Sequence, residues 1–148
     1  MKSLWQAPAR DELVQRLERL TPDARPAWGR LAAPQMVAHV ADALRMAFGD
    51  LPTASKGLPV RYTPLKQLII YWIPFPRNAP TAPELIARAP GDWEAEVRAC
   101  RTLVERFGTE PATRQQWPEH PAFGALTRHQ WGVLAYRHTD HHLRQFGA

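Results

Sequence analysis

The sequence contains a single cysteine, Cys100, among its 148 residues. One cysteine cannot form an internal disulfide, and it cannot supply the several thiolates of a cysteine-based zinc or iron–sulfur site. We interpret Cys100 as a small core residue rather than as a nucleophile. A chain without disulfides is typical of a reducing compartment.

Long hydrophobic runs are also absent. The N-terminal segment has no apolar stretch of the ~7–15 residues that a signal peptide requires. The longest apolar stretch, 65–73, contains Lys66 and Gln67 and is far shorter than the ~20 residues that span a bilayer. We therefore interpret 65–73 as a buried or cavity-lining segment rather than a membrane anchor. We expect a cytoplasmic protein with no membrane partner.

Lysine is scarce, although the chain is basic. Lys and Arg together number 19 against 14 Asp and Glu, which gives a net charge of +5 and a pI of about 10. Only three of these cations are lysines, and the arginines are scattered without a basic run or an RNA-binding motif interleaved with aromatics. Such scatter is typical of a solvated surface, so we expect no nucleic-acid partner.

The composition, 45% hydrophobic and 22% charged, excludes a disordered chain and a coiled-coil rod. Its length suits one compact domain over residues 1–148. Apolar residues recur at helical spacing in four segments, with no internal repeat and no strand-like alternation. Four such helices joined by long connections favour an all-α four-helix bundle, and the 15 prolines indicate that its loops are proline-rich. The predicted long helices lie near 10–20, 34–48, 92–107 and 127–146; segment 65–73 fits a short helix or a strand.

Histidines form the most informative pattern. On a helix with about 100° per residue, His138 and His142 share one face with the apolar Trp131, while Arg137 and Arg144 fall on the opposite, solvent side. Residues at i and i+4 can reach one ion together. His39 lies on the packed stripe of helix 34–48, so the three histidines can offer neutral nitrogens to zinc, nickel, iron or cobalt.

Neighbouring groups leave this interpretation open. Asp42 lies one turn after His39 and can orient a ligand or act as a base. His141 lies on the shoulder of the same face and can replace either neighbour, and Gln145 is a further neighbour. An HxxxH pair also arises by chance in helices, where core histidines hydrogen-bond to the backbone. We interpret the other two histidines, His120 and His129, as surface residues.

The layout of these residues resembles a known family. It runs Pro34-Gln-Met-x-x-His39-x-x-Asp42-x-x-Arg45, then Trp131-Gly, and then Tyr136-Arg-His138-x-Asp140-His141-His142-Leu-Arg-Gln145-Phe146-Gly147. This pattern is similar to that of the DinB-like superfamily (DinB/YfiT). Within it, the chain resembles a bacterial branch described only as a domain of unknown function. The resemblance covers nearly the whole chain, including 117–124, and His-x-x-x-His-x-x-Gln is its most specific element.

The resemblance implies an up-down-down-up four-helix bundle, often dimeric, in which His39, His138 and His142 hold a divalent metal. Relatives include thiol-dependent transferases and isomerases that use bacillithiol, mycothiol or glutathione. One function class is therefore a metal-dependent enzyme for transfer or hydrolysis on a small molecule. In that class, Arg45 or Arg137 is a candidate for holding an anionic substrate. The alternative is a non-catalytic bundle that binds a ligand or a partner and buries its histidines as a polar cluster.

For the enzyme, we expect three loops to line the entrance of the site. These loops are 50–63, 74–83 and 109–124, and their prolines, together with Trp72 and Trp117, suit a shaped apolar pocket. The non-catalytic alternative predicts that side chains close this entrance and leave no room for a ligand.

Overall fold

The computed structural model describes residues 1–77, 85 and 88–148, and its regular elements in these ranges are all helical. This confirms the predicted all-α class and the helical alternative for 65–73. Within the described residues, β-type pairing is limited to an isolated bridge between His120 and Gly124. The elements are α1 (Ala7–Glu18), α2 (Ala33–Phe48), the 3-10 helix η1 (Pro59–Arg61), α3 (Leu65–Tyr71), α4 (Trp93–Thr109) and α5 (Arg128–Gln145).

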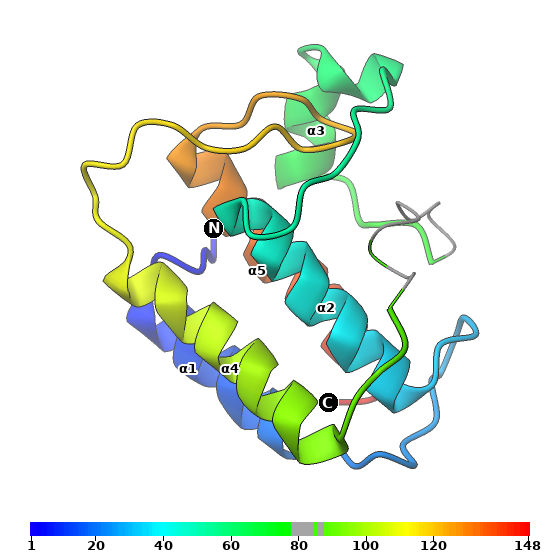
Figure 1. Cartoon of the computed structure of the whole chain (residues 1–148). Coiled ribbons are helices and arrows are strands. Elements are labelled where there is room, and N and C mark those ends of the chain that lie inside the picture. The colour runs from blue at the N-terminus through cyan, green and yellow to red at the C-terminus, as the bar shows by residue number, and fades with distance from the viewer. Residues whose placement is uncertain (78–84, 86–87) are drawn as a thin grey trace.

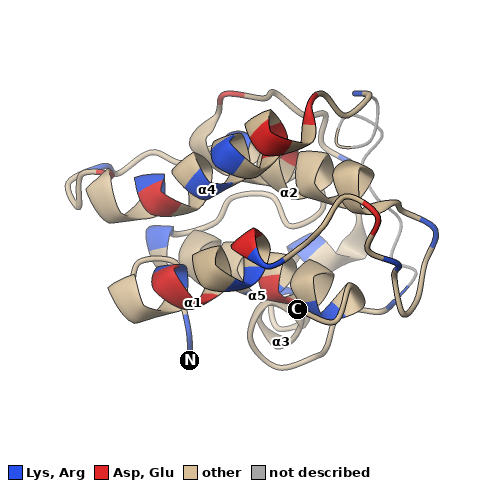
Figure 2. Cartoon of the chain, turned by 90° about the horizontal axis from the view of Figure 1, so that it is seen from below, with Lys and Arg blue, Asp and Glu red and all other residues tan. Residues whose placement is uncertain are grey.

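The four long helices pack in pairs. Both α1 and α2 contact α4 and α5, and Figure 1 shows α1 beside α4 and α2 beside α5. Helix α3 lies at one end of the molecule and contacts α5. Acidic and basic residues are interspersed along α1 and α4 (Figure 2). The space between the helices is mostly apolar, and Trp131, Phe107 and Leu13 are among its buried side chains; a smaller set of polar side chains, which includes His39, Asp42 and Glu96, is buried there as well.

Local sequence explains where the site-bearing helices begin and end. Helix α5 begins after Thr127, whose hydroxyl accepts from the Gln130 amide while the Gln130 side chain accepts from the Thr127 amide. Helix α2 has no capping hydroxyl, but the Gln35 side chain accepts from the Ala32 amide at 2.9 Å. It ends at Gly49, whose φ of 87° suits glycine.

Two helix boundaries differ from the prediction. Helix α1 begins at Ala7, three residues early, because Pro8 lies in the first turn, where its missing N–H has no helical partner to lose. Helix α4 continues through Gly108 to Thr109, whereas the predicted helix ends at 107, before this glycine. The guanidinium of Arg10 covers Gly108, so the glycine serves a close approach there rather than a helix end.

Segment 65–73 is not buried, contrary to our expectation. Ile70 is the buried residue of α3, while Leu65, Leu68 and Trp72 are exposed. The helix rests on α5 and η1 along one side, and its apolar residues extend beyond the side that these neighbours cover. Among the described residues, none of the helices has the length and apolarity needed to cross a bilayer.

Gly132 provides the first stability prediction. The N-terminal segment lies against α5 there, because the Leu4 amide donates to the Gly132 carbonyl at 3.0 Å. A Cβ at this position would lie 2.2 Å from the Trp5 indole and 2.4 Å from the Ser3 hydroxyl. We expect Gly132→Ala to lower the free energy of unfolding by about 2–3 kcal/mol, although alanine is the better helix former.

The matched control is Gly108→Ala, since its clash involves the flexible end of Arg10. Urea unfolding of both variants makes the comparison. A Gly132→Ala protein as stable as Gly108→Ala contradicts the proposed close packing.

Candidate metal centre

Three imidazoles come together between α2 and α5. The ring centroid of His39 lies 5.0 Å from that of His138 and 4.8 Å from that of His142, and the latter two lie 4.7 Å apart. One nitrogen from each ring lies within 4.8 Å of the other two. The i and i+4 spacing places the two α5 rings on one side of the helix, and the packing of α2 against α5 brings His39 to them.

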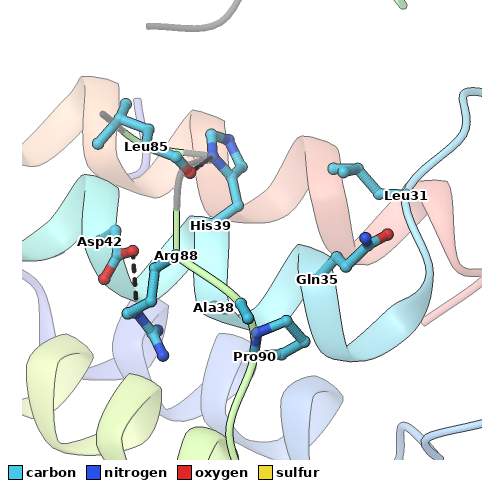
Figure 3. A pocket seen from close by; sticks show the side chains of 9 residues that line it. Leu31, Gln35, Ala38, His39, Asp42, Leu85, Arg88 and Pro90 are labelled. Carbon is cyan, nitrogen blue, oxygen red and sulfur yellow. Dashed lines mark hydrogen bonds and ion pairs between the residues drawn. The ribbon is translucent and has the colours of Figure 1, made fainter. Parts of the chain in front are cut away.

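The outer nitrogens of two rings have fixed partners. The His39 Nδ1 lies 3.1 Å from the Leu85 carbonyl oxygen, so it carries the proton and donates (Figure 3). The His142 Nδ1 lies 2.9 Å from Oε1 of Gln145, whose amide nitrogen donates to the Trp28 carbonyl. Both rings are therefore held as Nδ1–H tautomers, and each leaves an Nε2 lone pair for another group.

The rings of His138 and His39 approach each other through their Nε2 atoms. The His39 and His138 Nε2 atoms lie 3.1 Å apart. Because the His39 Nε2 is an acceptor, His138 Nε2–H donates to it when no ion is bound. Two nitrogens that bind one zinc tetrahedrally at about 2.0–2.1 Å lie about 3.3 Å apart. The observed spacing is therefore close to the spacing of two ligands of a single ion.

Burial keeps all three imidazoles neutral. It lowers the pKa of His39 and lowers the pKa of His142 to about 3. Burial, followed by the neighbouring His142 and His39, lowers the pKa of His138 well below its usual range. Metal ligation requires deprotonated nitrogens, and these rings supply them at neutral pH. A set of three neutral nitrogens fits zinc, nickel or iron and leaves coordination positions for water or substrate.

Asp42 does not orient His39, which corrects one expectation. Its carboxylate, 5% exposed, accepts from Arg45 at 2.5 Å and from Arg88 at 3.2 Å. Arg88 also makes a bidentate pair with the buried Glu96, and this pairing lowers the Glu96 pKa to about 2. Asp42 and Glu96 therefore anchor the chain around Arg88, and the partner of His39 comes from Leu85, three residues earlier.

A pocket of about 260 Å³ lies beside His39 (Figure 3). Its described walls come from α2, the residue Leu31 shortly before it, and the residues around Arg88. They are Leu31, Gln35, Ala38, His39, Asp42, Leu85, Arg88, Ala89 and Pro90. The predicted walls at 50–63 and 109–124 are not among them. Trp72 faces solvent, and Trp117 packs against Trp5 and Phe48.

The third predicted wall, 74–83, is described only as far as 77. Residues 78–83 of this loop lie outside the described residues. Within the described part, the Phe75 ring lies 6.5 Å from His138 and 6.0 Å from His141, so this loop does reach the histidines.

His141 lies at the edge of the cluster. Its ring is half-buried, 5.3 Å from His142 and 5.8 Å from Trp28, and it is not part of the group whose nitrogens converge. The two arginines considered for anion binding are already engaged. Arg45 pairs with Asp42, and Arg137 is partly buried and donates to the carbonyl ends of α3.

A model of a family described as a protein of unknown function (DUF1569) matches residues 5–148. The chain belongs to this family. No curated protein and no solved structure matches the chain. The three converging histidines all lie within the part that the DUF1569 model covers, and so do Leu85 and Gln145.

Several groups around the three histidines could not be predicted from the sequence. The Leu85 carbonyl is a backbone group, so no side-chain pattern reveals it. Arg88 precedes α4 and pairs with Asp42 on α2 and with Glu96 on α4. Asp42 is 46 residues away in the chain, so no helical spacing predicts that pair. Trp28 holds Gln145 through its carbonyl, which is again invisible in the sequence.

His120 is only partly exposed, although we expected a surface residue, whereas His129 is exposed as expected. The His120 ring packs against Trp131 and Phe123, and its Nδ1 accepts from the amides of Ala122 and Phe123. Burial lowers the His120 pKa to about 3. The folded protein therefore holds this ring neutral in solutions where an unfolded chain protonates it.

This difference predicts an acid-dependent loss of stability. The folded pKa of His120, about 3, is below the unfolded value of about 6.5, so only the unfolded chain takes up this proton between those values. Stability falls as the pH falls through this window. We expect His120→Asn, which keeps an acceptor, to reduce the slope of unfolding free energy against pH by up to about 1.4 kcal/mol per unit. Urea unfolding at several pH values measures both slopes, and equal slopes contradict the assignment.

Proposed function

We propose that this DUF1569 protein binds a divalent ion, zinc, nickel or iron, through His39, His138 and His142, and that it is a metal-dependent enzyme. The proposal depends on one observation, the convergence of three neutral imidazoles on one point. The Nδ1–H of His39 and of His142 is held by an oxygen acceptor, which turns the other nitrogen inward. A buried imidazole N–H needs an acceptor with or without a metal. What favours a metal is that these acceptors leave the remaining ring nitrogens grouped together, within 4.8 Å of one another.

We further propose that the four long helices form the up-down-down-up bundle of the DinB-like superfamily. Two observations support this assignment. Each long helix packs against two others, and the histidines lie on α2 and α5, where the resemblance places them.

The proposed reaction is transfer or hydrolysis on a small molecule. A bound divalent ion polarises a substrate group and lowers the pKa of a thiol or water. The chain contributes ligand orientation through Leu85 and Gln145, and the pocket beside His39 provides space for a small substrate. A thiol is the favoured nucleophile because the resembled family includes thiol-dependent transferases.

Thiol conjugation to an electrophile tests the catalytic proposal. Metal-loaded protein is assayed with bacillithiol, mycothiol and glutathione, and His142→Ala is compared with His129→Ala. Both variants remove a histidine from α5, but His129 is exposed and stacks on Tyr71, away from the cluster. We expect activity to be lost in His142→Ala and kept in His129→Ala. Equal activity in the two variants means that the metal takes no part in the reaction. If the wild-type protein shows no activity with any of the thiols, the result favours the non-catalytic ligand-binding alternative.

A further inference from the structure

Helix α3 and the turn before it expose an unusually apolar surface. Apart from Met1, the large hydrophobic side chains that are exposed in the described structure all belong to residues 58–73. Trp72 is 74% exposed and Tyr62 is 68% exposed. We define the α3 face as the set Leu58, Tyr62, Leu65, Leu68, Trp72 and Ile73. Large apolar side chains that are exposed together within one short segment indicate an interaction site.

The α3 face is held firmly against the rest of the protein. The Arg137 guanidinium of α5 donates to the carbonyls of Ile69, Ile70 and Ile73 and so satisfies the C-terminal end of α3. Ile70 is fully buried beneath the helix. Leu65 and Leu68 therefore lie on an anchored helix, which Figure 1 shows at one end of the molecule. Trp72 and Ile73 follow this helix directly, so their exposure is not the result of a frayed end.

The surrounding sequence is positive. Residues 51–73 contain no Asp or Glu, and they contain three cations, Lys56, Arg61 and Lys66. Arg77, further along the chain, lies over the Trp28 ring and is not counted here. The Lys66 ammonium donates to the Ala125 carbonyl, which satisfies a hydrogen bond without neutralising the charge. Arg61 has an acidic neighbour, Glu119, at 3.4 Å, and the Glu119 side chain is largely exposed.

Charge and residue type together indicate the partner. Trp and Tyr favour the boundary between water and lipid, and Lys and Arg beside them attract anionic headgroups. A symmetric contact between two copies through this face would bring two positively charged segments together. An anionic bilayer surface complements both the apolar side chains and the positive charge.

We propose that the α3 face binds the surface of an anionic lipid bilayer, with Trp72 and Leu68 inserted among the headgroups. Binding is peripheral, through a short helix that lies on the membrane surface. This inference departs from our expectation of no membrane partner. It is independent of the metal centre, because none of the α3-face residues belongs to the histidine cluster.

Vesicle sedimentation tests the proposal with the full chain. Vesicles of phosphatidylcholine alone are compared with vesicles that also contain phosphatidylglycerol. We expect binding to the anionic vesicles only, and we expect it to weaken as salt is added. Failure of the wild-type protein to bind, or equal binding to both vesicles, overturns the proposal.

Three variants separate the apolar and electrostatic contributions. We expect Trp72→Ser to weaken binding about tenfold and Lys66→Gln to weaken it about fivefold. Arg19→Gln also removes one cation, from the exposed end of α1, and leaves binding unchanged. Circular dichroism checks that each variant is folded. Wild-type affinity in Trp72→Ser overturns the proposal. If the wild-type protein is a dimer that does not bind vesicles, and Trp72→Ser dissociates this dimer, then the α3 face binds a second copy of the chain. That result also overturns the proposal.

Discussion

Replacing His138 by alanine is expected to weaken zinc binding more than about 100-fold, because two nitrogen ligands rarely hold a first-row ion tightly. His138 contacts both other rings of the cluster, with centroids 5.0 Å from His39 and 4.7 Å from His142. Its loss therefore removes one ligand without replacing it. Calorimetric titration of metal-free protein with zinc measures the change, and circular dichroism confirms that the variant is folded.

His141→Ala is the matched control for this prediction. It removes the neighbouring histidine from the same helix, but this ring is outside the converging group. We expect His141→Ala to keep zinc affinity within about tenfold of the wild type. Equal losses in the two variants mean that His141 is itself a ligand, and the assignment of His138 and His142 as the α5 pair is then incorrect.

Replacing Arg88 by methionine is expected to lower the free energy of unfolding by about 3 kcal/mol. The cation pairs with two buried carboxylates, Glu96 at 6% exposure and Asp42 at 5%. Removing it leaves Glu96 charged and buried with only the Gly91 amide as a donor among the described residues. The cost of that uncompensated charge exceeds the packing that methionine recovers.

Arg101→Met provides the comparison for Arg88→Met. Arg101 pairs with Glu18 and Glu105, and all three side chains are exposed, so the expected loss is below about 1 kcal/mol. Urea unfolding near neutral pH measures both variants. Similar losses in the two contradict a special role for the Arg88 network. We also expect Arg88→Met to weaken zinc binding, since Arg88 anchors the segment that presents the Leu85 carbonyl to His39.

The pattern in the sequence predicts the helices because their apolar spacing and their end residues are local properties. Thr127 and Gly49, for example, begin and end helices in the way that their residue types suggest. The i and i+4 spacing of His138 and His142 also fixes their common face, so the candidate ligands were predictable as a set. Gln145, which holds the outer nitrogen of His142, was also expected near the site, because it lies three residues further along the same helix. The partner of His39 was not predictable, because Leu85 is distant in the chain from His39.

The incorrect expectations have a common physical cause. Periodicity shows that a segment has an apolar side, but it does not show that another element covers that side. Leu65 and Leu68 are therefore exposed although the segment was expected to be buried. Conversely, the ring of His120, within the loop 109–124, packs onto Trp131, and this contact partly covers a residue expected at the surface.

Calorimetric titration of untagged, chelator-treated wild-type protein with zinc tests the central claim most directly. The convergence of His39, His138 and His142 predicts saturation at one ion per chain. It also predicts that bound zinc raises the unfolding temperature, because the ion binds the folded site and the unfolded chain does not preserve it. A wild-type protein that takes up no zinc, nickel or iron contradicts the account, and the three imidazoles are then a buried hydrogen-bonded cluster.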